Sequence, residues 1–293
     1  MPQIDVVIPA YNEERSIADT VGKVKSMLDG AGVDYGVIVV DDGSRDGTAA
    51  IAEQLDDVTL VRHRSNRGYG AALKTGIKNS RAEYIGIVDA DGTYPIERLP
   101  DLFNVALDTG SDHVIGARTG ANVHDTPGRW VARRVLRLIA WFATGRWIPD
   151  LNSGMRVFSR ELAHQYWALY PNGFSFTTTI TIASLQSRAD VRFVPIDYFE
   201  RAGKSHIKPV KDFFRFFALI LRVSFIYAPL RFFVAPGIVL FLAGLTISIV
   251  QIAGEHGLAD SAVITTLVGA QLLLNGLIAE SLARLHLRRQ PID

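Results

Sequence analysis

Short apolar segments alternate with amphipathic segments through the first two thirds of the chain. The apolar segments have the length of buried strands and lie at 4–9, 37–40, 59–61, 84–88, 114–116 and 191–195. The segments between them have the apolar spacing of helices at 17–28, 48–55 and 71–80, and a further helix is expected to begin near 174. Asn12 is expected to cap the first helix. The alternation predicts an α/β fold, with a mostly parallel sheet covered by helices on both faces.

Two later segments are apolar enough to cross a membrane. Phe232–Ala253 and Ser261–Ala279 contain no charged residue, and a bilayer span needs about 20 mostly apolar residues. Buried helices of a globular core are the alternative, but such helices rarely run this long without a charge. We therefore expect a two-helix transmembrane domain at 231–293, with spans at about 232–253 and 261–282.

The basic residues that flank these spans predict their orientation. They stand before the first span and after the second, at Lys208, Lys211, Arg215, Arg222, Arg231, Arg284, Arg288 and Arg289. The connector GEHGLAD has no lysine or arginine. The positive-inside rule then places both termini in the cytoplasm, in a multi-pass protein of the cell (inner) membrane. The N-terminus has no basic region ahead of an apolar run, so we expect no secretory signal.

Residues 208–230 mix aromatic, apolar and basic side chains. On a helix, the basic residues fall roughly on one side, and Phe213, Phe217, Ile220 and Leu221 fall mainly on the other. This pattern predicts an amphipathic helix in the membrane interface, although a helix packed on the domain with its basic side in solvent would look the same. The domain that precedes it is expected to span residues 1–207.

Composition excludes several functions. The net charge of the 293-residue chain is +1, which gives no electrostatic basis for nucleic-acid binding. The chain has no cysteine, which excludes disulfides, thiolate metal sites and cysteine nucleophiles.

Carboxylates follow three of the predicted strands where each strand ends. They are Glu13, Asp41, Asp42, Asp89 and Asp91. Ligands bind at the carboxyl ends of parallel strands, so we expect these side chains to share one edge of the sheet. Neighbouring carboxylates repel unless a cation or hydrogen-bond donors compensate. One aspartate at a strand end is more often a turn former, but three strand ends together favour Mg²⁺ or Mn²⁺ with substrate phosphates.

The ordered motifs resemble a known family. VVIPAYNEE, VVDDGSRDGT, NRGYGAALKTG and VDADGTYP resemble a family 2 glycosyltransferase with the Rossmann-like GT-A fold. PDLNSGMRVFSR and PIDYFERAGKSHIKPVKDFFRF resemble the branch of dolichyl-phosphate mannose synthases and bacterial polyprenyl-phosphate glycosyltransferases. The resemblance runs from residue 4 to about 217. It implies a metal-dependent, inverting transfer of one sugar from a UDP- or GDP-linked hexose to a polyprenyl phosphate, at the cytoplasmic membrane face.

The resemblance also implies the donor-binding residues. The base and ribose would lie among Pro9, Tyr11, Glu13, Asp41 and Asp42. In the same way, Asp89 would contact the nucleotide and the metal, and Asp91 would be the main metal ligand. Lys74 lies where its positive charge could approach the donor. A solvent-exposed lysine on a helix, with no role in binding, would explain this position equally well.

The acceptor end is expected to be basic. A lipid phosphate is already an anionic nucleophile, so it needs positioning by cations rather than a strong general base. The candidates are Arg118, Arg133, Arg201 and Lys204, and the resemblance implies that Ser153 and Gly154 line the same site. Arg133 lies in RWVARRVLR, whose arginines could equally face lipid head groups. By resemblance, Asp150 would orient the sugar or stabilise an oxocarbenium-like state, unless it only caps a turn.

Two positions depart from the family pattern. Thr93 lies where dolichyl-phosphate mannose synthases often have a glutamine that ligates the metal, so Thr93 is a weaker candidate ligand that water could replace. Thr178 and Thr179 occupy a region where related enzymes often have a glutamate, and we assign them no catalytic role.

Three other functions compete with this interpretation. The first is a dinucleotide-binding enzyme, since GYGAAL at 68–73 resembles the start of the GxGxxG motif. This segment lacks the third glycine and does not follow the first strand. A processive polysaccharide synthase would need more membrane spans and a QxxRW-like segment. A non-catalytic membrane module that binds nucleotide sugars is the third.

Small residues at Gly237, Gly244, Gly269 and Gly276 would allow close helix contact and give weak support to a homo-oligomer.

Overall fold

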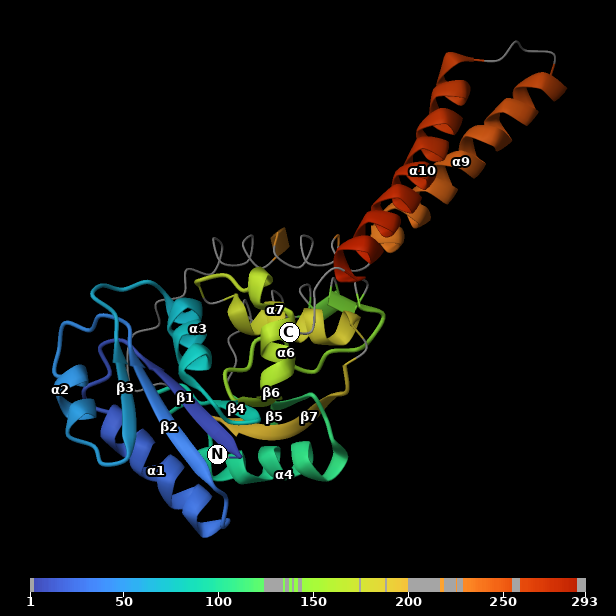
Figure 1. The fold of residues 1–293 in the computed structure, drawn as a ribbon. Coiled ribbons are helices and arrows are strands. Elements are labelled where there is room, and N and C mark those ends of the chain that lie inside the picture. Colours follow the sequence, from blue (N-terminus) through green and yellow to red (C-terminus); the bar gives the residue numbers. More distant parts are fainter. Residues whose placement is uncertain are drawn as a thin grey trace. The chain divides into compact units, whose positions relative to one another are not determined.

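The protein forms two compact units, Met1–Ile220 and Leu221–Asp293, in a computed structural model (Figure 1). The structure describes residues 3–123, 134, 137–138, 140–141, 144–173, 175–187, 189–199, 217–218, 225, 229–254 and 259–288. The expected domain boundaries at 207 and 230 and the amphipathic segment 208–230 fall mainly outside these residues. Those boundaries and that segment therefore stay predictions.

The N-terminal unit is built on a seven-stranded mixed sheet with strand order β3-β2-β1-β4-β6-β5-β7. The strands are β1 (Ile4–Ala10), β2 (Tyr35–Asp41), β3 (Val58–Arg62), β4 (Tyr84–Ile87), β5 (His113–Val123), β6 (Arg156–Ser159) and β7 (Val191–Tyr198). Strands β1 to β4 pair in parallel, β6 is antiparallel to both of its neighbours, and β7 is parallel to β5. The predicted α/β fold with a mostly parallel sheet is confirmed.

Helices cover both faces of this sheet, as Figure 1 shows. They are α1 (Ile17–Gly30), α2 (Thr48–Glu53), α3 (Tyr69–Asn79), α4 (Leu99–Thr109), α6 (Arg160–Gln165) and α7 (Phe176–Gln186), with short 3₁₀ turns at Ile96–Arg98 and Trp167–Leu169. Helices α1 and α4 pack on one face and α3 on the other, where Gly76 leaves no room for a side chain against Val7. The central strand β1 is buried along its whole length, which explains why it reads as a continuous apolar run.

One local prediction, the cap of the first helix, was wrong. Asn12 does not cap α1, which begins at Ile17. Asn12 has a φ of 56°, and its side-chain oxygen accepts a hydrogen bond from the backbone N–H of Arg45 in the neighbouring loop. Strand β6 was not predicted, because Arg156 interrupts its short apolar run with a charge.

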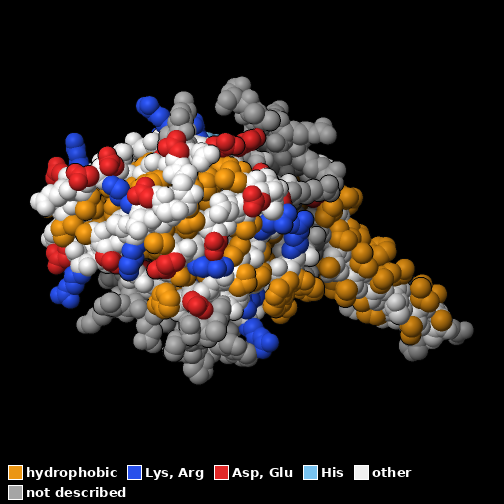
Figure 2. Space-filling model, turned by 90° about the horizontal axis from the view of Figure 1, so that it is seen from below, with side chains coloured by type: hydrophobic (Ala, Val, Ile, Leu, Met, Phe, Trp, Pro, Cys, Tyr) orange, Lys and Arg blue, Asp and Glu red, His pale blue; other side chains and the backbone are white. Residues whose placement is uncertain are grey.

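The C-terminal unit is a hairpin of two long helices, α9 (Pro229–Ala253) and α10 (Asp260–Arg288). By length and composition, Phe232–Ala253 and Asp260–Ala283 are long and apolar enough to cross a membrane. Figure 2 shows hydrophobic side chains over the hairpin surface, whereas charged side chains are scattered over the N-terminal unit.

The four glycines expected to allow helix contact lie inside this hairpin. A side chain at Gly244 would overlap with Thr266, and one at Gly269 would overlap with the backbone of Phe241. Gly237 similarly contacts Leu273. These glycines bring α9 and α10 of one chain together, so they give no support to association between chains.

Candidate active site

The ends of β1, β2 and β4 lie at one edge of the sheet. Ala10 is the register partner of Asp41, and Val7 is the partner of Ile87, two residues before Asp89. The backbone therefore brings the three acidic strand ends together as predicted.

The side chain of Asp42 stabilises the loop that leads into α3. Its carboxylate accepts hydrogen bonds from the backbone N–H groups of Arg67 (2.9 Å) and Gly68 (2.8 Å), and it pairs with Nδ1 of His63 at 2.6 Å. Gly68 has a φ of 100°, and a side chain at Gly70 would overlap with the carbonyl oxygen of Pro171. The glycines of GYGAAL therefore serve the close packing of this loop, which accounts for them without a bound dinucleotide.

The other donor-side candidates lie around the same strand ends. Asp41 is almost fully buried and accepts a hydrogen bond from the backbone N–H of Ser44 at 3.1 Å. Glu13 and Tyr11 are half-buried in the loop after β1, and Pro9 is buried within that strand. Lys74 is half-buried on α3 and donates to the carbonyl oxygen of Tyr170 at 3.2 Å, and burial together with Arg67 lowers its pKa.

Asp89 and Asp91 have different surroundings although they are only two residues apart. Asp89 accepts a hydrogen bond from the hydroxyl of Tyr69 at 2.8 Å and packs directly against Gly154, where a side chain would overlap with its carboxylate. Burial and the charge of Asp91 raise the pKa of Asp89 to about 7. Asp91 accepts hydrogen bonds from the hydroxyl (2.7 Å) and the backbone N–H (3.2 Å) of Thr93.

These two carboxylates fit a hard divalent cation. Both are oxygen donors, and burial together with the charge of Asp91 disfavours the ionised form of Asp89, which a bound cation would stabilise. The hydroxyl of Thr93 is fully buried and donates to Asp91, so it orients that carboxylate. Within the described residues, no group of three or more His, Cys, Asp or Glu side chains could hold a metal, so water and substrate phosphates would complete the coordination.

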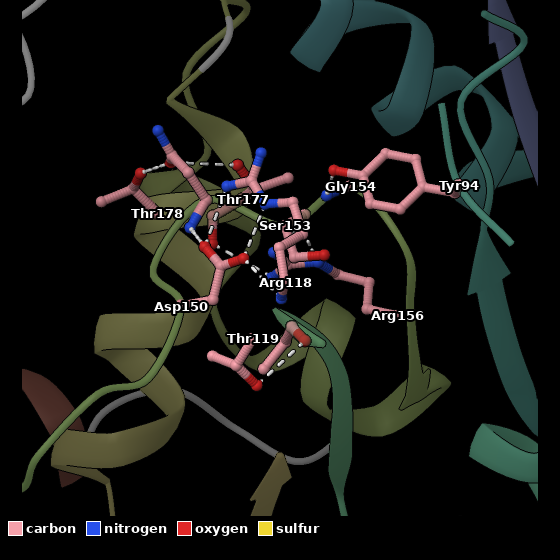
Figure 3. Close-up of polar contacts among 11 residues, drawn as sticks. Tyr94, Arg118, Thr119, Asp150, Ser153, Gly154, Arg156, Thr177 and Thr178 are labelled. Carbon is pink, nitrogen blue, oxygen red and sulfur yellow. Dashed lines mark hydrogen bonds and ion pairs between the residues drawn. The ribbon is translucent and has the colours of Figure 1, made fainter. Parts of the chain in front are cut away.

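Arg118 and Asp150 form a buried ion pair, shown in Figure 3. Nε of Arg118 donates to Oδ2 of Asp150 at 2.6 Å, and one terminal nitrogen donates to Oδ1 at 2.9 Å. The backbone N–H groups of Arg118 and Asn152 donate to the same carboxylate. Burial alone would raise the pKa of Asp150, but the charge of Arg118 and these hydrogen bonds outweigh it and hold the pKa at about 2. The guanidinium also lies over the ring of Tyr198, 5.0 Å from its centroid.

The loop after Asp150 carries an unpaired hydroxyl. Ser153 is fully buried, and its Oγ has no hydrogen-bond partner among the described residues. Leaving such a group unpaired costs about 1–3 kcal/mol. Its neighbour Gly154 donates its N–H to the hydroxyl of Tyr94 at 2.6 Å. The other cations expected at the acceptor, Arg133, Arg201 and Lys204, lie outside the described residues.

The sequence interpretation missed Arg156. This side chain is fully buried, and its guanidinium donates to the carbonyl oxygens of Ser153 and Thr177 and to the hydroxyl of Thr181. Burial lowers its pKa to about 10. Arg156 thereby fixes the 150–154 loop to the start of α7. A charged residue inside the apolar run MRVF was the signal, because such a residue must be satisfied within the fold.

His113 completes this buried network. One of its ring nitrogens, Nε2, lies 3.4 Å from Arg156, and the other, Nδ1, lies 3.1 Å from the hydroxyl of Ser184. Burial and the charge of Arg156 lower the pKa of His113 well below its usual value, so the ring is neutral. Since arginine can only donate, Nε2 accepts and Nδ1 carries the proton.

Comparisons with known proteins match both units. Residues 5–167 match the family model of glycosyl transferase family 2. This chain belongs to glycosyltransferase family 2. Residues 228–285 match the GtrB C-terminal hairpin, which covers α9 and most of α10.

Named relatives support the same family. The chain is 30% identical over 291 residues to the low-salt glycan biosynthesis hexosyltransferase Agl6 of Haloferax volcanii, a match that covers 94% of this chain and 68% of that protein. It is 34% identical over 209 residues to the polyprenol monophosphomannose synthase of Mycolicibacterium smegmatis, covering 67% of this chain and 77% of that protein. The family and branch predicted from the motifs are confirmed.

Solved structures share the GT-A fold of this glycosyltransferase. The glucosyl-3-phosphoglycerate synthase of Mycobacterium tuberculosis, in complex with Mn²⁺, UDP-glucose and phosphoglyceric acid, has a TM-score of 0.61 at 21% identity, over 76% of this chain and 80% of that one. The mannosyl-3-phosphoglycerate synthase of Rubrobacter xylanophilus has a TM-score of 0.59 at 16% identity, over 76% and 72% of the two chains. At this identity the likeness shows the fold.

Gly154 gives a first test of the site. We expect Gly154→Ala to lower sugar transfer by about a hundredfold, because the added methyl group would displace the carboxylate of Asp89. Initial rates and thermal midpoints of the two proteins would be compared. Gly22→Ala is the matched control, because the space around Gly22 on α1 is open and its activity should be unchanged. An unchanged rate for Gly154→Ala would contradict the placement of Asp89 in the site.

Proposed function

We propose that this glycosyltransferase transfers a single sugar, with inversion, from a UDP- or GDP-linked hexose to a polyprenyl phosphate. The reaction would take place at the cytoplasmic face of the membrane, with both chain termini on that side. The main support is the contact between Gly154 and Asp89, because it joins the acidic strand ends to the 150–154 loop, whose Asp150 pairs with Arg118 of β5. The membrane-length hairpin in the same chain favours a lipid acceptor.

The donor would occupy the edge where β1, β2 and β4 end. Pro9, Tyr11, Glu13 and Asp41 would frame its base and ribose, with Asp42 holding the α3 loop in place. Asp89 and Asp91 would hold Mg²⁺ or Mn²⁺ on the diphosphate. The metal, when bound, would neutralise the negative charge of the departing nucleoside diphosphate. Lys74 would add a positive charge on the α3 side.

The acceptor would approach the 150–154 loop. Arg118 would supply a fixed positive charge to the lipid phosphate, and Asp150 would keep that guanidinium in one orientation. The unpaired hydroxyl of Ser153 supports a ligand oxygen nearby, since a bound phosphate or sugar would satisfy it. Arg133, Arg201 and Lys204 are proposed as further phosphate contacts.

The stereochemistry follows from the chemistry of this acceptor. A phosphate monoester is ionised at neutral pH and can attack the anomeric carbon directly. A single direct attack from the face opposite the leaving diphosphate inverts the anomeric configuration. The protein would need to position the two substrates and exclude water.

A donor panel tests the proposal. Purified full-length protein would be incubated with Mn²⁺, a short polyprenyl phosphate and labelled UDP- or GDP-linked sugars, and the lipid fraction would be counted. We expect one donor to label the lipid, and the label to require the metal. No labelled lipid with any donor would overturn the proposal.

Thr93 provides a prediction about the metal. We expect Thr93→Val to raise the Mn²⁺ concentration for half-maximal activity about tenfold, because Asp91 loses the hydrogen bond that orients it. Thr93→Ser should stay close to the wild type, since the hydroxyl is kept. Metal titrations of the initial rate would compare the three proteins, and equal metal requirements would exclude this role of Thr93.

A further inference from the structure

Tyr69 connects the start of α3 to one of the acidic strand ends. Its hydroxyl donates to Oδ1 of Asp89 at 2.8 Å, and among the described residues it supplies the one hydrogen bond that this carboxylate receives. The other oxygen, Oδ2, lies against Gly154, where an added side chain would overlap with it. Contacts on both oxygens therefore hold the Asp89 carboxylate in one orientation.

Gly154 is itself fixed by a second tyrosine. Its backbone N–H donates to the hydroxyl of Tyr94 at 2.6 Å (Figure 3). Tyr94 is buried, and its ring packs edge-on against the ring of Tyr198, with 5.3 Å between the centroids. The Gly154 side of Asp89 is thus a fixed surface. Because this surface offers Asp89 only van der Waals contact, the hydrogen bond from Tyr69 determines how the carboxylate is turned.

The position of Tyr69 is fixed by contacts on two sides of the helix start. Tyr69 is the first residue of α3. On one side, the backbone N–H of Gly68 donates to Asp42 at 2.8 Å. On the other side, the backbone N–H of Ala71 donates to the carbonyl oxygen of Asn172 at 3.0 Å. The phenol ring therefore extends towards Asp89 from an anchored stretch of backbone.

His63 holds Asp42 in turn. Nδ1 of the imidazole lies 2.6 Å from Oδ1 of Asp42, and Nε2 lies 2.9 Å from the hydroxyl of Thr75 on α3. An ionised carboxylate can only accept, so Nδ1 carries a proton. The side chains of His63 and Asp42 are each 4% exposed. The imidazole therefore fixes the carboxylate that anchors the start of α3, although it lies outside the acidic strand ends.

We propose that Tyr69 is a positioning residue for Asp89, and that His63, acting through Asp42, keeps Tyr69 in place. This inference rests on the proposed function, in which Asp89 helps to hold a divalent cation on the donor diphosphate. Hydrogen-bond partners that orient a metal ligand change the metal affinity by about 10–100-fold when they are removed. A merely structural tyrosine or histidine would change the stability of the unit and leave that affinity unaltered.

Binding of Mn²⁺ alone to the purified full-length protein tests Tyr69 without reference to catalysis. Tyr69→Phe removes only the hydroxyl, and we expect it to raise the Kd for Mn²⁺ about tenfold, measured from the paramagnetic resonance signal of the free ion. Tyr35→Phe is the matched control, because the hydroxyl of Tyr35 also donates to an aspartate, Asp29, at 2.9 Å, at the amino end of β2. Its Kd should equal that of the wild type.

Two substitutions test the part of His63. His63→Leu removes the donor to Asp42 and should also raise the Kd for Mn²⁺, whereas His63→Asn keeps an N–H close to the place of Nδ1 and should restore the wild-type value. In the Tyr69→Phe background, His63→Leu should have no further effect, because it acts through the lost hydroxyl. Thermal midpoints of all variants would be measured alongside.

This inference and the proposed transfer reaction fail in different ways. If the wild type transferred no sugar to lipid while Tyr69→Phe still weakened Mn²⁺ binding, the role of Tyr69 would stand and the reaction would be wrong. Three results would overturn the role of Tyr69: a Kd equal to that of the wild type, an equal effect of Tyr35→Phe, or wild-type Mn²⁺ binding that is absent or insensitive to Asp91→Asn. Additive effects of His63→Leu and Tyr69→Phe would overturn the part of His63.

Discussion

Replacing Asp91 with asparagine is expected to lower sugar transfer by about three orders of magnitude and leave the fold intact. Asp91 is half-exposed in the loop that follows β4, so the loss of its charge should change stability little. Its expected role is to hold the metal that neutralises the leaving diphosphate, and asparagine supplies no negative charge for that purpose. Transfer rates over a Mn²⁺ series, together with thermal midpoints, measure both effects.

The control for Asp91 is another exposed aspartate. Asp101 on α4 pairs with Arg98 at 2.9 Å on the surface of the same unit. Asp101→Asn removes the same charge away from the strand ends and should leave the transfer rate unchanged. If Asp91→Asn retained a rate within about threefold of the wild type at saturating Mn²⁺, Asp91 could not be the main metal ligand.

Replacing Arg118 with methionine is expected to destabilise the N-terminal unit by about 3–5 kcal/mol and to abolish transfer. The substitution leaves the carboxylate of Asp150 buried without its charge partner, since the side chains of Arg118 and Asp150 are only 15% and 7% exposed. Proteolytic susceptibility in increasing urea would report the stability of this unit. The double variant Arg118→Met with Asp150→Leu should recover most of the stability but none of the activity, because a buried pair can be replaced by apolar side chains.

The destabilisation by Arg118→Met should depend on pH. In the wild type the pKa of Asp150 is about 2, below its ordinary value near 3.9, so the pair stabilises the fold above pH 4. That contribution is lost as the pH falls through about 2. In the variant, burial alone acts on Asp150 and raises its pKa, so the stability difference should be largest at neutral pH and shrink on acidification. A difference that stays constant from pH 7 to pH 3 would show that the lost charge pair is not its cause.

The fold and the meeting of the acidic strand ends at one edge of the sheet were predictable because local patterns determine them. Buried parallel strands are apolar runs in the sequence, and the residues that follow each run lie at the carboxyl edge of the sheet. Asp41, Asp89 and Asp91 could therefore be placed at this edge from the sequence alone. The two long C-terminal helices were predictable for a similar reason, since their sequences are continuous apolar runs of membrane-spanning length.

The contacts within the site were not predictable, because they join residues far apart in the chain. Arg118 and Asp150 were expected to act separately, on the acceptor and on the sugar. In the structure they form an ion pair although they are 32 residues apart in the sequence. Arg156 was missed because its partners come from the 150–154 loop and α7. The glycines of α9 and α10 suggested an oligomer, yet they are used within one hairpin. In each case a contact between residues far apart in the chain decided between interpretations that the residue types alone left open.

A lipid phosphate, and not a lipid hydroxyl, is expected to be the acceptor, and one comparison distinguishes the two. The wild-type enzyme would be given its donor and Mn²⁺ together with a polyprenyl phosphate or the matching polyprenol, and the lipids would be weighed by mass spectrometry. We expect the polyprenyl phosphate to gain the mass of one hexose and the polyprenol to be unchanged. Transfer to the polyprenol, or a ladder of products with several hexoses, would contradict it.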